Sequence, residues 1–188
     1  MSADRRSRNN VFAGLVLDRC SERRLDTGWL DAAQRAEAAR YLVIDPAGRG
    51  LTTADATSLY FLDNTRRSRL LPECAPTLLG LDERQVPYFA LAPDKESAAG
   101  MGAACAASFV DLRRAALGLS AFEAGLFAYA RGIAHWQART RFCGTCGSPL
   151  ALEWAGHRAR CTNPACAIEH FPRTDPAIIV IVTWRDAC

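Results

Sequence analysis

The hydrophobic pattern of this 188-residue chain changes character near residue 120. Before that point, short apolar runs alternate with turn signals about every ten residues, a spacing typical of strand-rich folds. Strands are predicted at 41–44, 59–62, 77–81 and 86–91, the last two forming a hairpin. Helices are predicted at 32–39 and 109–117, and 93–102 is expected to be a loop. The first part is therefore expected to be an α+β domain.

A longer helix is predicted to follow. The Ser120-Ala-Phe-Glu123 sequence predicts a capping box. In it, the Ser120 hydroxyl accepts a hydrogen bond from the Glu123 backbone N–H, and the Glu123 side chain can reach back to the Ser120 backbone N–H. Apolar residues then recur at helical spacing, at Phe122, Leu126, Tyr129, Ile133 and Trp136. The helix is expected to end near Arg139-Thr140. Gly125 and Gly132 should weaken it unless a neighbour packs closely there.

Four cysteines follow that helix in two close pairs. Cys143 and Cys146 flank Gly-Thr, and Cys161 and Cys166 follow after fourteen residues. This spacing predicts a tetrahedral zinc site in which all four positions are filled by protein, so the metal would be structural. Arginines at 141, 158 and 160 can offset the thiolate charge, and histidines at 157 and 170 are possible substitute ligands. A redox dithiol, the alternative, normally lies at a helix N-terminus after a strand, and that context is absent.

The segment after the second cysteine pair changes character again. Pro172 and Pro176 predict an extended connector, and 177–184 is an apolar, β-branched run that predicts a buried strand. This strand either begins a further domain or joins an earlier sheet. We therefore predict a first domain at 1–139, a four-cysteine ribbon at 140–174 and the start of another domain at 175–188.

Composition excludes fewer classes of function than the motifs do. The net charge of +3 is too small to indicate nucleic-acid binding by itself. The sequence has no uninterrupted apolar run of about eighteen residues and no secretory signal, so we expect a cytoplasmic protein without membrane contact. Cysteine pairs in such a reducing compartment favour metal over disulfide. The scattered Cys20, Cys74, Cys105 and Cys188 are expected to be small buried hydrophobic residues.

Three segments resemble the NADH pyrophosphatases of the Nudix superfamily. The clearest matches are the helix-to-ribbon junction at 134–147 and the ribbon exit at 170–179, and 10–30 is similar to the family's opening segment. The resemblance implies a rudimentary Nudix-like domain, a Cys₄ zinc ribbon and a catalytic Nudix domain. It also implies a homodimer that hydrolyses NAD(H) with Mg²⁺ or Mn²⁺, and in some members removes NAD caps from RNA.

The family's catalytic element is missing from these 188 residues. The Nudix box, Gly-x5-Glu-x7-Arg-Glu-x-x-Glu-Glu-x-Gly, holds the divalent metals with its clustered glutamates. No Glu-Glu pair occurs here, and the acidic residues after Cys166 are Glu169, Asp175 and Asp186. We therefore expect this chain to be the truncated front of such an enzyme and to be inactive alone.

The resemblance also suggests two substrate contacts. Phe171 stands where members often have a tyrosine that contacts substrate, and its ring could stack on a base or pack the ribbon against the next domain. Arg113, beside Arg114, stands where a basic residue approaches substrate, but a solvated arginine is the favoured interpretation, because charged residues are usually exposed. Two other hypotheses stay open: a stand-alone zinc-ribbon module that binds nucleic acid or protein through its arginines, and a degenerate homologue retained for structure or heterodimerisation.

Overall fold

The first domain is built on a four-stranded mixed sheet. The computed structural model describes residues 10–173, 180, 182 and 185. The sheet has the order β3-β1-β5-β4, with β1 (Arg40–Val43), β3 (Phe61–Leu62), β4 (Thr77–Leu81) and β5 (Pro87–Leu91). Strands β1 and β5 are parallel and the other pairs are antiparallel. All four predicted strands exist, although β3 is shorter than expected, and the α+β class is confirmed.

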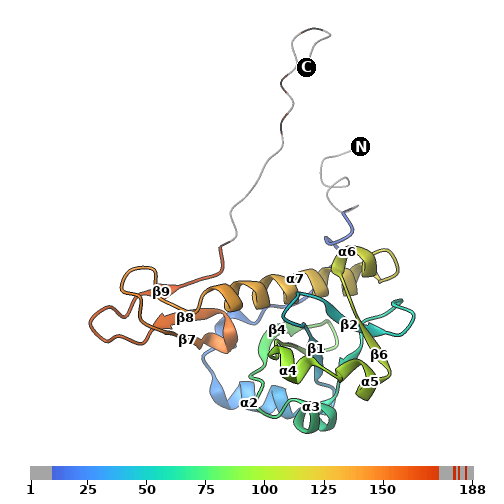
Figure 1. Ribbon diagram of the computed structural model, residues 1–188, viewed down its shortest axis with the longest axis horizontal. Helices are drawn as coiled ribbons and strands as arrows, with labels where there is room; N and C mark the ends of the chain where they lie inside the picture. Colours follow the sequence, from blue (N-terminus) through green and yellow to red (C-terminus); the bar gives the residue numbers. More distant parts are fainter. Residues whose placement is uncertain (1–9, 174–179, 181, 183–184, 186–188) are drawn as a thin grey trace.

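Both faces of this sheet are buried. Tyr41 and Val43 lie in one apolar cluster, while Leu42 and Ile44 lie in the other, because successive side chains of a strand point to opposite faces. The first cluster includes partly buried Trp29 of α2 (Thr27–Arg35), and the second includes Phe127 of α7 (Ala121–Arg139). The sheet therefore forms the middle layer of the domain (Figure 1).

The short helices differ most from the sequence prediction. Helix α2 begins five residues before the predicted start, because Asp26 caps it by accepting a hydrogen bond from the Trp29 backbone N–H. The helix ends at Arg35. The segment 93–102 was predicted as a loop, but it contains α4 (Lys95–Ala98) and the start of α5 (Met101–Cys105). Helix α3 (Asn64–Leu70) was not predicted. Asp63 and Asp94 cap α3 and α4 in the same way as Asp26 caps α2.

The predicted helix at 109–117 is wrong in its first part. Residues Ala107–Val110 form strand β6, which pairs antiparallel with β2 (Gly50–Thr53), another strand that the sequence did not reveal. Only Leu112–Ala115 is helical, as α6, with its N-terminus capped by Asp111. Pairing with a distant strand therefore prevailed over the local apolar pattern.

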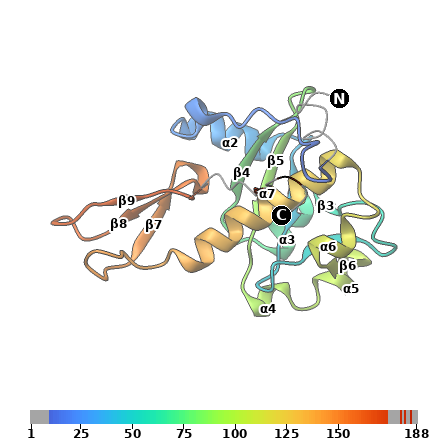
Figure 2. The same cartoon turned by 90° about the horizontal axis from the view of Figure 1, so that it is seen from above.

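The long helix α7 matches its prediction closely. Ser120 and Glu123 form the predicted capping box, and the helix ends at Arg139. Glu123 also accepts a hydrogen bond from the Leu59 backbone N–H, which ties the start of the helix to the sheet domain. Figure 2 shows that α7 crosses the first domain and continues toward the cysteine-containing ribbon. It is therefore a structural connection between the two regions.

The ribbon is a small antiparallel sheet beyond the end of α7. It contains β7 (Leu150–Glu153), β8 (Arg158–Cys161) and β9 (Glu169–His170) in that order. A short 3-10 turn, η2 (Trp154–Gly156), joins β7 to β8, and a second one, η1 (Ser21–Arg23), lies in the N-terminal segment. The ribbon buries very few apolar side chains, so another interaction must hold it together.

The strand predicted at 177–184 lies largely outside the described residues, as does Cys188. Within the described part of the chain, every helix is too short or too polar to cross a membrane.

Candidate functional site

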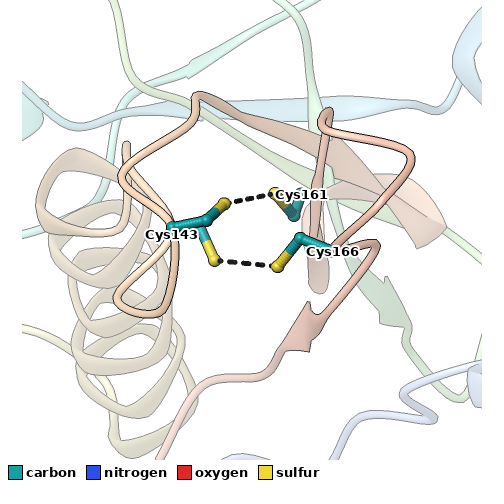
Figure 3. Close-up of side chains that lie close together, drawn as sticks. Cys143, Cys161 and Cys166 are labelled. Atoms are coloured by element: carbon teal, nitrogen blue, oxygen red, sulfur yellow. Dashed lines mark hydrogen bonds between the residues drawn. The ribbon is translucent and has the colours of Figure 1, made fainter.

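The structure brings the four paired cysteines together at the end of the ribbon opposite the η2 turn. All four Sγ atoms lie within 4.8 Å of one another, although the pairs come from different turns. The Sγ atoms of Cys143 and Cys166 are 3.7 Å apart, and those of Cys146 and Cys161 are 3.4 Å apart. Figure 3 shows the sulfurs of these turns facing one another. One donor cluster is thus assembled from two turns at the same end of the ribbon, the end where Leu150 pairs with Cys161.

Two tight turns aim the sulfurs inward. In the first turn the Gly147 backbone N–H donates to the Cys143 carbonyl, and Gly147 has a φ of +74°, which favours glycine. In the second turn the side chain of Asn163 accepts from the Ala165 N–H, and the Cys166 N–H donates to the Asn163 carbonyl. These local hydrogen bonds within the protein define the shapes of both turns without contribution from a metal ion.

The donor set fits a zinc ion. A tetrahedral zinc with Zn–S bonds of about 2.3 Å separates its sulfurs by about 3.8 Å, close to the distances within the cluster. Cys143 and Cys161 are buried, whereas Cys146 is exposed at the surface. Four thiolates would complete the coordination and leave no position for water, so bound zinc would stabilise the ribbon and would not activate a nucleophile.

The thiols differ in acidity. Hydrogen bonds from the Cys146 backbone, and then from the His170 side chain, lower the pKa of Cys143 to about 5. Burial and the neighbouring thiols raise the pKa of Cys161 to about 12. The side chain and backbone of Ser148 lower the pKa of Cys146. The pKa of Cys166 is raised as well, by burial and by the neighbouring Cys146 and Cys143 thiols. The cluster therefore combines two thiols that ionise readily with two that resist ionisation until a cation compensates their charge.

Neither histidine that the sequence offered as a substitute ligand belongs to the cluster. His170 lies beside the cluster, where its side chain helps to lower the pKa of Cys143. His157 is buried elsewhere and its Nε2 lies 2.6 Å from the carbonyl oxygen of Leu78. His170 is therefore placed to orient a ligand, as partners of metal ligands commonly do.

Arg158 has a structural role that the sequence did not indicate. Its guanidinium pairs with Glu153 of β7 and Glu169 of β9, each at 2.6 Å, and lies over the Trp154 ring. Only 14% of its side chain is exposed. Arg158 therefore connects all three ribbon strands, and its removal would disturb the ribbon itself. Arg160 is exposed and lies on the same strand.

The ribbon is joined to the first domain at the η2 turn. Gln137 of α7 donates through Nε2 to the Thr77 hydroxyl at 2.9 Å and to the Gly156 carbonyl at 2.8 Å. His157, next to that glycine, bonds the adjacent Leu78 carbonyl. The sequence carried no signal for this junction, because its partners come from separate parts of the chain and are ordinary residues.

Burial sets the protonation of His157. The pKa of His157 is lowered to about 4, mainly by desolvation; the bond to Leu78 opposes this shift, and the nearby guanidinium groups of Arg24 and Arg19 contribute to it. Neutral His157 donates its Nε2–H to the carbonyl. The junction is therefore formed by an uncharged imidazole at neutral pH.

The two suggested substrate contacts lie at opposite ends of α7. Phe171 follows β9, is 47% exposed, and its ring contacts Trp154 at 5.9 Å. Arg113 is exposed on α6, beside the start of α7. The nineteen residues of α7 span about 28 Å at 1.5 Å each. Phe171 and Arg113 of one chain therefore do not form a single site.

The scattered cysteines behave mainly as expected. Cys20 and Cys105 are buried and Cys74 is partly buried. Burial raises the pKa of each of these three thiols, which disfavours the reactive thiolate.

Two family models match consecutive parts of the chain. Residues 39–136 match the NADH pyrophosphatase-like rudimentary Nudix domain, which is more than half of the sequence. The chain belongs to the NADH pyrophosphatase family of Nudix hydrolases. Residues 138–171 match the NADH pyrophosphatase zinc ribbon domain, and this match contains all four clustered cysteines. The family resemblance seen in the sequence is therefore confirmed.

Curated relatives match over limited lengths. The chain is 48% identical over 61 residues to the NAD-capped RNA hydrolase NudC of Stutzerimonas stutzeri, covering 32% of this chain and 21% of that protein. It is 35% identical over 78 residues to human NAD-capped RNA hydrolase NUDT12, covering 38% and 17%. It is 28% identical over 120 residues to human mitochondrial NAD(P)H pyrophosphatase NUDT13, covering 59% and 34%. The chain thus matches about a third or less of each relative's length.

Proposed function

We propose that this chain is the front of a Nudix NAD(H) pyrophosphatase. Residues 1–139 would be its rudimentary Nudix domain, 140–174 its zinc ribbon and 175–188 the start of its catalytic domain. The observation that carries this proposal is the order of two family-specific segments, at 39–136 and 138–171. The parent reaction would be the hydrolysis of NAD(H) to NMN(H) and AMP, or removal of an NAD cap from RNA, activities that the relatives' names support.

The chain by itself would not perform this reaction. The Nudix box and its clustered glutamates are absent from the 188 residues, so Mg²⁺ or Mn²⁺ would bind to another part of the parent enzyme. Among the described residues, the histidine, cysteine and acidic groups gathered closely enough to hold a metal are the four cysteines. Their task would be to bind one structural zinc ion.

The two domains would then serve as a scaffold. The exposed ring of Phe171 would contribute to the substrate wall. Because Phe171 and Arg113 are far apart in one chain, contact of both with one substrate would need a second copy, which agrees with the homodimer that the family resemblance implies. A reducing, cytoplasmic location remains part of the proposal, because it keeps the zinc-binding thiols reduced.

The first experiment measures zinc and activity of the purified 188-residue chain. We expect about one zinc per chain and no AMP or reduced nicotinamide mononucleotide from NADH with Mg²⁺ or Mn²⁺. Formation of these products would contradict the proposed inactivity. Absence of zinc from a folded chain would contradict the proposed metal site.

The second experiment reads the coding sequence that follows Cys188 and expresses the longer protein. We expect a Nudix box within about a hundred residues, a typical domain length, and NADH hydrolysis by that protein. The control changes the Glu-Glu pair of the box to Gln-Gln, which should abolish the reaction without zinc loss. A longer protein with no box would refute the parent assignment.

A further inference from the structure

A second site lies between α7 and the ribbon, and its lining contains none of the four clustered cysteines. This pocket has a volume of about 1110 Å³. Its walls come from three separate segments: the N-terminal segment with Arg19 and Arg24, one face of α7 with Gly132 and Trp136, and the ribbon exit at 169–173. We call it the α7–ribbon pocket. It exceeds the roughly 300–1,000 Å³ of common small-molecule sites, so it has room for an extended ligand.

The lining of the α7–ribbon pocket is strongly basic. Among the described residues of its lining are four arginines, at positions 19, 24, 139 and 173, and one acidic residue, Glu169. That carboxylate is already paired with Arg158 at 2.6 Å. The pocket therefore attracts an anionic ligand.

Two of these arginines are held in place by uncharged groups of the described residues. The guanidinium of Arg19 stacks 3.6 Å from the centre of the Tyr129 ring. Arg24 donates through Nη2 to the Arg19 carbonyl at 2.9 Å. Both partners are uncharged, so the guanidinium groups are positioned in advance and keep their positive charge for a ligand. A guanidinium binds a phosphate through two parallel hydrogen bonds.

Gly132 opens the middle of the pocket. Gly132 lies far from both ends of α7 and is exposed to solvent, and no atom lies within 4 Å of the place that a Cβ would occupy. Gly125 on the same helix is different, because a Cβ there would lie 2.7 Å from the Cβ of Leu15. Packing thus explains Gly125 but not Gly132, although a helical glycine costs roughly 0.5–1 kcal/mol relative to alanine. The missing side chain at 132 keeps the helix face open next to the Trp136 ring.

We propose that the α7–ribbon pocket binds single-stranded RNA, with phosphates on Arg19 and Arg24 and a base against Trp136. Aromatic rings beside a positively charged groove are the combination that single-strand binding uses, whereas an acidic peptide would gain little from the rings. The choice of RNA rests on the proposed function, in which a capped RNA is one substrate. The site itself uses no residue of the zinc cluster and none of the Nudix box.

The test uses a fluorescein-labelled, uncapped oligo(A) of about six nucleotides and the zinc-loaded 188-residue chain. Binding is followed by fluorescence anisotropy at about 50 mM salt. We expect Arg19→Gln with Arg24→Gln to weaken binding roughly tenfold and to lower the salt dependence by about one to two charges. The matched control, Arg69→Gln with Arg114→Gln, removes the same charge from exposed positions outside the pocket and should leave binding unchanged.

A third variant separates binding from folding. Gly132→Leu should fill the pocket and weaken binding about tenfold, while the chain becomes equally or more resistant to thermal unfolding, since leucine favours helix. Three results would each overturn the proposal. They are an equal loss of oligonucleotide affinity in the Arg19/Arg24 double variant and its Arg69/Arg114 control, unchanged affinity of Gly132→Leu, and no binding of the oligonucleotide at low salt. Competition by free AMP as strong as by the unlabelled oligonucleotide would indicate a mononucleotide site and refute RNA. None of these readouts depends on NADH hydrolysis, so the two proposals fail separately.

Discussion

The sheet domain and the ribbon of this protein are stabilised by different means. The sheet domain buries large apolar side chains on both faces of its central sheet, including Tyr41, Phe89 and Phe127. The ribbon buries little more than two cysteines, Ala159 and His157, and leaves Leu152 and Phe142 about half or more exposed. A region this small cannot fold on apolar burial alone, so it needs a metal or a disulfide, and its thiols are arranged for a metal.

Removing zinc should have the largest effect on this difference. Structural zinc in small ribbons supplies on the order of 10–16 kcal/mol to folding. We expect Cys146→Ser or chelation to unfold the ribbon while the sheet domain keeps its structure. Hydrogen exchange measured by mass spectrometry should show new exchange in 140–171 and protection retained in the β1–β5 region. Loss of protection throughout the chain would show that the predicted boundary near Thr140 is wrong.

The converse change should break the sheet domain first. Phe127 is fully buried and packs on Gly50, where a Cβ would lie 2.6 Å from its ring. We expect Phe127→Ala to lower the free energy of unfolding by about 3–5 kcal/mol in urea titrations, with zinc content retained. The matched control is Phe142→Ala, at a ribbon position that is 61% exposed, where a change under about 0.5 kcal/mol is expected. A larger loss at 142 would reveal a ribbon core that the burial pattern does not show.

Acid should weaken the junction between the two regions. The folded pKa of His157 is about 4, below its usual 6.5. Between these values the unfolded chain binds a proton that the folded chain does not. Stability should therefore be complete above pH 6.5 and should fall as the pH drops toward 4, by up to about 3 kcal/mol. Urea titrations of zinc-loaded wild type and His157→Gln across this range provide the measurement, and an equally steep loss in the variant would exclude His157 as the cause.

A smaller change tests the same contact from the glycine beside it. Gly156 has a φ of +91°, and a Cβ there would lie 2.5 Å from the Thr77 hydroxyl oxygen. We expect Gly156→Ala to cost about 1–3 kcal/mol from strain and contact together. Gly100→Ala is the control, because Gly100 has a φ of +82° with no neighbouring atom within 4 Å. The difference in thermal unfolding temperature between the two variants measures the contribution of the contact. Equal losses of stability would mean that the η2 turn does not pack closely against β4.

Elements with a local cause were predictable from the sequence. The capping box located the start of α7, and alternating apolar runs located the four strands of the main sheet. The errors occurred where one short segment depends on another. The last two residues of strand β6, Phe109 and Val110, were assigned to a helix because their partner strand, β2, is more than fifty residues away. Helix α2 was misplaced because the Asp26 cap outweighed the apolar pattern that follows it.

The candidate sites divide in the same way. Cysteine spacing alone predicted the four-sulfur cluster, since two short turns are enough to bring each pair together. The α7–ribbon pocket and the structural role of Arg158 were not predictable, because arginines look alike in a sequence. Arg158 is paired with two carboxylates, whereas Arg19 is stacked on an aromatic ring, and only their neighbours distinguish them.

The sequence by itself determined the family, the mixed fold class, the long helix and the set of thiols, because each depends on residues close together in the chain. The tertiary structure decided how the two regions meet. His157 bonds a carbonyl 79 positions away, and Gln137 bonds a hydroxyl 60 positions away. Such contacts form only after the sheet and α7 have placed both partners, and no local pattern of residue types encodes them.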